Sequence, residues 1–255
     1  MKNDVLWEGD TAFEHYQVTD TVYDGRPARV LYSGDRRAAQ SGLAQDTESD
    51  LLFDYNQRLF ELVTNLDPTR LLLIGGGVGT LPTALLAALP TISIDVVELD
   101  SGLTDLAYRY FDLPKDDRLR VFHTDGRLYL EETRETYDVI VVDAFNHTAI
   151  PHNIKTFEAF QAYNKHLTSG GILAMNIISG YYGPSAKILK EVCAASTQFF
   201  SDVDVFLASR GYSLWLPQNF VLAAQKGISL PLQAYVRHAA VNPIIARKAD
   251  ILHDE

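Results

Sequence analysis

The chain of 255 residues is 47% hydrophobic, which supplies enough apolar side chains for a sizeable core and excludes disorder as the default state. Its formal net charge of -11 argues against a nucleic-acid backbone or an anionic membrane as the main partner. The same charge suits a cationic small molecule such as a polyamine, and it accounts equally well for solubility alone.

Cysteine content and hydropathy narrow the class of protein further. Cys193 is the single cysteine, which excludes an internal disulfide framework and a cysteine-type zinc site. Residues 1–10 lack the apolar segment of a secretory signal, and no apolar run approaches the roughly 20 residues of a membrane span. We therefore expect a cytoplasmic protein.

The N-terminal residues follow strand and turn patterns. Segments 15–23 (HYQVTDTVY) and 28–34 (ARVLYSG) predict two strands joined by a turn at DGRP. Segment 40–50 is polar and predicts a loop before a helix at 51–66. The candidate caps for this helix are Asp46, Thr47, Ser49 and Asp50.

From Arg70 onward, short apolar strands alternate with helical segments. Regular alternation of this kind builds a parallel sheet covered by helices on both faces. Segments 202–209 and 219–225 are strands with no helix between them, so they predict an antiparallel pair at one edge. Five parallel strands finished by such a pair resemble the class I SAM-dependent methyltransferase architecture, an α/β, Rossmann-like fold with a seven-stranded sheet. The predicted parallel strands are 70–75, 93–100, 119–125, 137–145 and 172–178.

We therefore divide the chain into two parts. Residues 1–50 form an N-terminal β-hairpin region, and residues 51–255 form a Rossmann-like domain that binds a nucleoside and carries the catalytic residues.

A glycine-rich loop separates the first parallel strand from its helix. The segment LLLIGGGVGTLP turns directly from four apolar residues into glycines, which allow a sharp bend and a close approach of backbone to a ligand. By itself this loop suits either NAD or another nucleoside cofactor. The candidate ligand-binding glycines are Gly75, Gly76, Gly77 and Gly79.

Acidic residues end the next three strands. Glu98 lies about 20 residues beyond the loop, where an acid binds ribose hydroxyls. Asp125 precedes Gly126 and can accept a hydrogen bond from an adenine amino group, although Asp-Gly is also a common turn. Asp143 ends the fourth strand. Because ligands bind beyond the carboxyl ends of parallel strands, we expect these residues to converge on an S-adenosyl-type nucleoside.

The loop and the strand ends together resemble a known family. The segments LLLIGGGVGTL, VVELD, HTDGRLYLEE and YDVIVVDAF are similar to the core of the spermidine synthase family, the polyamine aminopropyltransferases. The resemblance extends from Tyr16 to Ile177. It implies a homodimeric enzyme of polyamine biosynthesis that takes decarboxylated S-adenosylmethionine and a small-molecule amine, without a metal.

The resemblance also assigns roles to residues. It makes Asp143 the base that removes a proton from the attacking amine, and it has Tyr55 position that amine. A deprotonated amine is required because a protonated one cannot attack carbon. The resemblance places Gln40 against the cofactor, Glu98 on the ribose, and Asp125 and Gly126 near adenine.

Three positions depart from the family pattern. Val78, Asn146 and Gln57 stand where the family carries acids. The departures leave three functions open. One is an aminopropyltransferase that binds its amine through Asp46, Glu48 or Asp50. Another is a methyltransferase of the same fold that uses S-adenosylmethionine itself on a small molecule. The third is a non-catalytic nucleoside-binding homologue.

Overall fold

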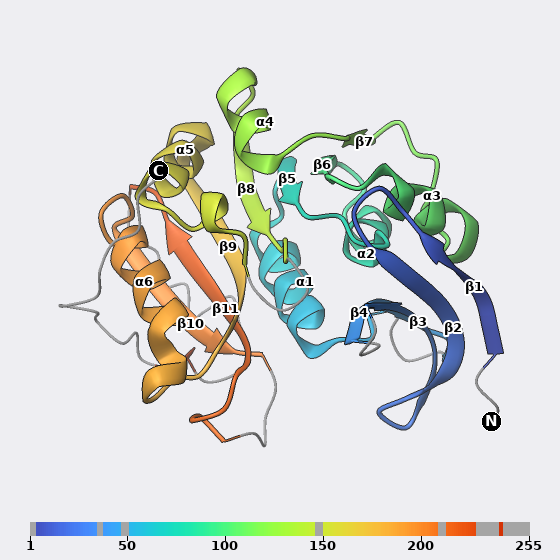
Figure 1. Ribbon diagram of the computed structural model, residues 1–255. Coiled ribbons are helices and arrows are strands. Elements are labelled where there is room, and N and C mark those ends of the chain that lie inside the picture. Colours follow the sequence, from blue (N-terminus) through green and yellow to red (C-terminus); the bar gives the residue numbers. More distant parts are fainter. Residues whose placement is uncertain are drawn as a thin grey trace.

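The computed structural model describes residues 4–34, 38–46, 51–145, 150–208, 213–227 and 240–241. These residues form two β-sheets, with helices packed on the larger one (Figure 1). Within the described ranges, no helix is both long and apolar enough to cross a bilayer. The division of the chain at residue 50 stays a prediction.

The N-terminal sheet has four antiparallel strands in the order of the sequence. Asp24 and Gly25 have φ of 47° and 80°, as a two-residue hairpin turn requires, so the predicted hairpin is confirmed. The prediction of a loop over 40–50 was wrong for its first half, because pairing with the preceding strand overrides the weak strand propensity of AAQSGLA. The strands are β1 (Asp4–Asp10), β2 (His15–Tyr23), β3 (Arg26–Ser33) and β4 (Ala38–Ala44).

The larger sheet has the strand order β12-β10-β11-β9-β8-β5-β6-β7. The strands from β5 to β9 are parallel, and β10 and β11 are antiparallel, as predicted. The short β12 adds an eighth strand to the seven expected. The strands are β5 (Arg70–Ile74), β6 (Ser93–Val97), β7 (Leu119–Phe122), β8 (Tyr137–Val142), β9 (Leu167–Ser179), β10 (Asp202–Leu207), β11 (Gln218–Gln225) and β12 (Ala240–Val241).

Helices cover both faces of the larger sheet (Figure 1). Successive residues of β5 alternate between the faces: Leu71 and Leu73 pack with α1 and α2, while Leu72 packs with α4, α5 and α6. A strand apolar on both sides is typical of a buried parallel sheet. The helices are α1 (Asp54–Leu66), α2 (Thr80–Ala88), α3 (Ser101–Tyr110), α4 (Gly126–Glu132), α5 (Phe157–His166) and α6 (Lys187–Ser196), with 3-10 turns η1 (His152–Ile154) and η2 (Pro184–Ala186).

The start of α1 differs from the prediction. Its N-cap is Phe53, which makes no side-chain capping bond. Asp46 instead forms an ion pair with Arg26, whose Nε donates to its carboxylate at 2.7 Å. The other predicted caps, Thr47, Ser49 and Asp50, lie outside the described residues.

An apolar cluster joins the two sheets. Tyr16, Val18 and Leu31 of the N-terminal sheet pack against Leu103 and Phe111 of the α3 region. Figure 1 shows the N-terminal sheet beside α2 and α3, at one side of the molecule. This packing brings the N-terminal sheet next to the carboxyl ends of the parallel strands.

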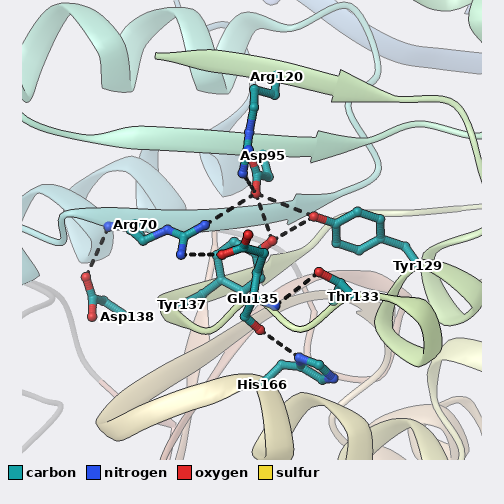
Figure 2. A network of polar contacts seen from close by, with 9 residues as sticks. All are labelled: Arg70, Asp95, Arg120, Tyr129, Thr133, Glu135, Tyr137, Asp138 and His166. Atoms are coloured by element: carbon teal, nitrogen blue, oxygen red, sulfur yellow. Dashed lines mark hydrogen bonds and ion pairs between the residues drawn. The ribbon is translucent and has the colours of Figure 1, made fainter.

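A polar network joins the parallel strands near their amino ends, away from the carboxyl ends that face the N-terminal sheet (Figure 2). The carboxylate of Asp95 is 2% exposed and accepts hydrogen bonds from Arg120 Nε at 2.6 Å and from the Tyr137 hydroxyl at 2.8 Å. Arg70, at the start of β5, lies 3.9 Å from the same carboxylate. Since a buried charge is tolerated only when it is paired, the network fixes β6 against its neighbours.

Candidate active site

A cavity of about 430 Å³ lies where the carboxyl ends of the parallel strands meet the N-terminal sheet. Its wall includes Gln40 and Ser41 from β4, side chains from α1, and the residues that follow β5, β6, β7 and β8. Every predicted site residue except Gly79 contributes to this wall: Gln40, Tyr55, Gly75, Gly76, Gly77, Glu98, Asp125, Gly126 and Asp143.

The glycine loop lies against the end of β8. Gly75 has φ of 90°, and a Cβ there would come within 2.4 Å of the carbonyl oxygen of Asp143. Only glycine permits this close approach. Gly79 has a different role, because it precedes α2 outside the cavity wall, with φ of 76°. A Cβ at Gly79 would lie 2.6 Å from a terminal methyl group of Leu113, and the left-handed φ itself favours glycine here.

Glu98 holds the glycine loop in place. Its Oε2 accepts hydrogen bonds from the backbone of Gly76 at 2.9 Å and Gly77 at 3.0 Å, and its Oε1 accepts one from Asp100 N at 2.9 Å. Burial raises the pKa of Glu98, and these backbone donors oppose that rise. Each carboxylate oxygen has two lone pairs, so Oε1 retains acceptor capacity for a ligand hydroxyl. The predicted ribose contact stays a prediction.

Asp125 is both a cavity residue and a helix cap. Its Oδ1 accepts from the backbone of Arg127 at 2.8 Å and Leu128 at 3.1 Å, at the start of α4. Its Oδ2 accepts from Asn153 Nδ2 at 3.0 Å. The sequence alone did not identify Asn153, which also lines the cavity. Both interpretations of Asp125-Gly126, the turn and the ligand site, are compatible with this geometry.

Asp143 is partly buried and lines the cavity wall. Burial raises its pKa from 3.8 to about 7, and the charge of Glu98 adds to the rise. Hydrogen bonds from Asn176 and from the Tyr55 hydroxyl oppose the rise, the former at 2.8 Å. A carboxylate that titrates near neutral pH suits a general base, because it is ionised in part and still basic enough to take a proton.

Tyr55 and Asn56 lie in the first turn of α1, and the Tyr55 hydroxyl contacts Asp143. Burial and the charge of Asp143 raise the pKa of Tyr55 well above its ordinary value, so the hydroxyl stays neutral. Asn56 is 3% exposed, lines the cavity, and leaves its Oδ1 without a hydrogen-bond partner. Nothing in the sequence pattern points to Asn56 except its place next to Tyr55. A buried carbonyl oxygen without a partner is expected to receive a donor from a ligand.

The charge of the cavity has one sign. Among the described residues that line it there is no Lys, Arg or His. Carboxylates of one sign in a cleft concentrate cations there. The site therefore suits a sulfonium or an ammonium group. The carboxylates in the wall are Glu14, Glu98, Asp100, Asp125 and Asp143.

Two of the three positions that depart from the family pattern, Val78 and Gln57, lie outside the wall of this cavity. Val78 is fully buried in the cluster between the sheets and does not line the cavity. Gln57 is also absent from the wall, and its Nε2 donates to the carbonyl of Leu51 at 3.0 Å. Asn146 lies outside the described residues.

Asp46, Glu48 and Asp50 are the acids that could bind the amine in place of the missing ones. Asp46 does not line the cavity, because its carboxylate pairs with Arg26. The suggestion that Asp46 binds the amine was therefore wrong. Glu48 and Asp50 lie outside the described residues.

The strand order, with a cavity at the carboxyl ends of the parallel strands, defines a class I methyltransferase-like fold. The sequence profile "Spermine/spermidine synthase domain" matches residues 52–223. The chain therefore belongs to the spermine/spermidine synthase family, as its motifs indicated.

Individual relatives agree with this assignment. The chain is 36% identical over 178 residues to a polyamine aminopropyltransferase of Vibrio vulnificus, covering 68% of this chain and 57% of the relative. It is 31% identical over 173 residues to a polyamine aminopropyltransferase of Clostridium beijerinckii, covering 66% of this chain and 61% of the relative. The chain thus spans about three fifths of the length of these two relatives.

Solved structures confirm the fold. A "probable spermidine synthase" of Corynebacterium glutamicum superposes with a TM-score of 0.80 at 18% identity, covering 98% of this chain and 96% of the other. The spermidine synthase of Thermotoga maritima gives a TM-score of 0.70 at 18% identity, covering 91% of this chain and 76% of the other. The predicted class I methyltransferase-like fold is confirmed.

Proposed function

We propose that the protein is an aminopropyltransferase that moves the aminopropyl group of decarboxylated S-adenosylmethionine to an amine. The observation that carries the proposal is the acidic cavity, in which Asp143 titrates near neutral pH beside a wall of further carboxylates. Both reactants are cations at neutral pH. Decarboxylated S-adenosylmethionine carries a sulfonium and an ammonium group, and the acceptor amine is protonated. The family membership supports the same reaction.

The residues suit each step of this transfer. Asp143 takes a proton from the ammonium of the acceptor, which frees the nitrogen lone pair. The lone pair attacks the methylene carbon next to sulfur, the C–N bond forms, and the C–S bond breaks with its electrons on sulfur. The products are the alkylated amine and methylthioadenosine. Because the sulfonium is already a good leaving group, alignment of the reactants supplies much of the remaining rate.

Tyr55 and Asn56 supply the alignment in this proposal. The Tyr55 hydroxyl donates to Asp143 and fixes the direction of its carboxylate. The partnerless Oδ1 of Asn56 accepts a hydrogen bond from an ammonium group of one reactant. A hydrogen bond to a charged group contributes about 1.5–3 kcal/mol, enough to orient a flexible chain.

A methyltransferase is the competing function, and the fold alone does not exclude it. A human methyltransferase-like protein 13 in complex with SAH shares the fold with a TM-score of 0.59 at 23% identity. S-adenosylmethionine, however, carries a carboxylate. In the described part of the cavity wall no cation is present to pair with it. A carboxylate among acids of the same sign is disfavoured.

The test is a direct assay of transfer. The purified protein is incubated with decarboxylated S-adenosylmethionine and a set of mono-, di- and triamines, and mass spectrometry follows the products. The proposal expects methylthioadenosine together with an amine that has gained an aminopropyl group. A parallel reaction with S-adenosylmethionine serves as the control. Methylated amine from that control, with no aminopropyl product, contradicts the proposal.

The family resemblance supports further, finer proposals. We infer that the protein acts as a homodimer in the cytoplasm, without a metal, a nucleic acid or a membrane. Light scattering after size exclusion tests the dimer, and transfer in the presence of EDTA tests independence from metal. A monomer would contradict the first proposal, and loss of transfer that added metal restores would contradict the second.

A further inference from the structure

Two asparagines from neighbouring strands are linked to Asp143 by a chain of hydrogen bonds. Asn176 is 2% exposed, and its Nδ2 donates to Asp143 Oδ1 at 2.8 Å. Asn219 Nδ2 in turn donates to Asn176 Oδ1 at 3.0 Å. Neither asparagine is part of the cavity wall. Any influence of these two residues on a bound reactant therefore passes through Asp143.

The strand registers bring these side chains onto one face of the sheet. Met175 pairs with Val142, so the next residues, Asn176 and Asp143, are neighbours across the parallel strands β9 and β8. Asn219 lies on the antiparallel strand β11, where it pairs with Ile178 of β9. It is thus the diagonal neighbour of Asn176, within reach of its side chain.

We propose that Asn176 and Asn219 are positioning residues, which together hold the Asp143 carboxylate in the orientation and the ionised state needed to take a proton. The inference rests on the proposed function for its catalytic meaning. A side-chain amide has donors on one side and an acceptor on the other. Because Asn219 donates to the oxygen of Asn176, the amino group of Asn176 is the side that faces Asp143.

The reverse orientation of Asn176 would be unfavourable. Its carbonyl oxygen would then face a carboxylate oxygen, and two acceptors without a proton between them repel. Asn219 prevents this reversal by occupying the acceptor side of the amide. The two asparagines therefore act in series, with Asn219 orienting Asn176 and Asn176 orienting Asp143.

The electrostatic surroundings make the donor from Asn176 important. The titratable groups that act on Asp143 are Tyr55 from α1 and Glu98 from the end of β6. Burial and Glu98 favour the protonated carboxyl, while the hydrogen bonds from Asn176 and Tyr55 favour the carboxylate. Loss of the Asn176 donor should therefore raise the pKa of Asp143 further and leave a smaller ionised fraction at neutral pH to accept a proton from an amine.

Substitution by leucine, which has a similar volume, tests the pair. Asn176→Leu should raise the midpoint of the Asp143 titration by about 1–2 pH units, because it removes a hydrogen bond to a charged group. Asn219→Leu should raise it by about half as much, because the amide of Asn176 then loses the hydrogen bond that fixes its orientation toward Asp143. Gln218→Met is the matched control. Gln218 is an amide on the opposite face of β11, which bonds Ser213 and lies outside the cavity wall.

The readout is the carboxyl carbon signal of Asp143 in the ¹³C NMR spectrum, assigned by its loss in Asp143→Asn. Turnover against pH is measured in parallel. The acidic limb of the profile should move upward by the same amount as the NMR midpoint, with kcat at pH 7 falling and KM nearly unchanged.

Two outcomes separate the inference from the proposed function. A midpoint that stays within about 0.3 pH units of wild type in Asn219→Leu overturns the inference, even if Asn176→Leu does not fold. A shifted midpoint in a protein that transfers no aminopropyl group contradicts the proposed function and leaves the hold on Asp143 intact.

Discussion

Replacing Asp143 by asparagine should lower turnover strongly and stabilise the protein at the same time. Burial raises the pKa of Asp143 from 3.8 to about 7. A difference of about three pH units corresponds to about 4 kcal/mol of preference for the protonated form. A neutral amide avoids this unfavourable ionisation, but it loses the charge-assisted bonds from Asn176 and Tyr55. We expect a net gain of about 1–3 kcal/mol at pH 8.

The gain should depend on pH in a defined direction. Because the folded protein holds the Asp143 proton more tightly than the unfolded chain does, the free energy of unfolding of wild type falls as pH rises from about 4 to about 7. Asp143→Asn lacks this fall, so its advantage is absent near pH 4 and complete above pH 7. Turnover should drop about 10²–10⁴-fold, the usual contribution of a general base.

Urea unfolding followed by tryptophan fluorescence at pH 4.5, 6 and 8 measures the stability. Asp138, at the other end of β8, provides the matched control. Its Oδ2 accepts from Thr69 N and Arg70 N, both at 3.0 Å, and its pKa is lowered by these and further hydrogen bonds despite its burial. Asp138→Asn should therefore destabilise by about 1–3 kcal/mol at pH 8 and by less as the pH falls through the lowered pKa. Destabilisation of similar size by both variants at pH 8 would refute the reasoning.

Three further substitutions test other parts of the account. Tyr55→Phe should lower kcat about 10–100-fold with the nucleoside Kd unchanged, since it removes a hydrogen bond to the carboxylate; a normal kcat excludes Tyr55 from the reaction. Gly75→Ala should abolish nucleoside binding in calorimetry, because its Cβ meets the Asp143 carbonyl oxygen at 2.4 Å; retained affinity would show that the loop adapts. Asp95→Asn should lower the free energy of unfolding by about 3–5 kcal/mol while the folded fraction keeps its turnover, and a smaller loss would make the network in Figure 2 dispensable.

Much of the site follows from the sequence because parallel strands end at a common edge. The loop after β5 and the acids after β6, β7 and β8 must meet there, whatever the details of packing. Gln40 and Tyr55 came from the family resemblance, and both line the same cavity. The sign of the cavity charge could also be anticipated from these strand ends.

Other features depend on contacts that a sequence pattern does not contain. Val78 is one residue from the cavity wall along the chain, yet the turn of the glycine loop directs it into the cluster between the sheets. Asn176 lies within an apolar strand, and only the register of β8, β9 and β11 places it behind Asp143. The weakly strand-forming segment of β4 is a strand because β3 pairs with it. In each case a contact with another element, which the local sequence pattern does not contain, decides the structure.

The central claim is that this acidic cavity receives an adenosyl sulfonium compound without a carboxylate. Isothermal titration calorimetry on the wild-type protein with decarboxylated S-adenosylmethionine and with S-adenosylmethionine measures it most directly. We predict that the decarboxylated compound binds about 10-fold or more tightly than S-adenosylmethionine, because the carboxylate of the latter is repelled by the acids of the cavity. A tenfold difference in affinity corresponds to about 1.4 kcal/mol. Equal affinities, or tighter binding of S-adenosylmethionine, would contradict the account.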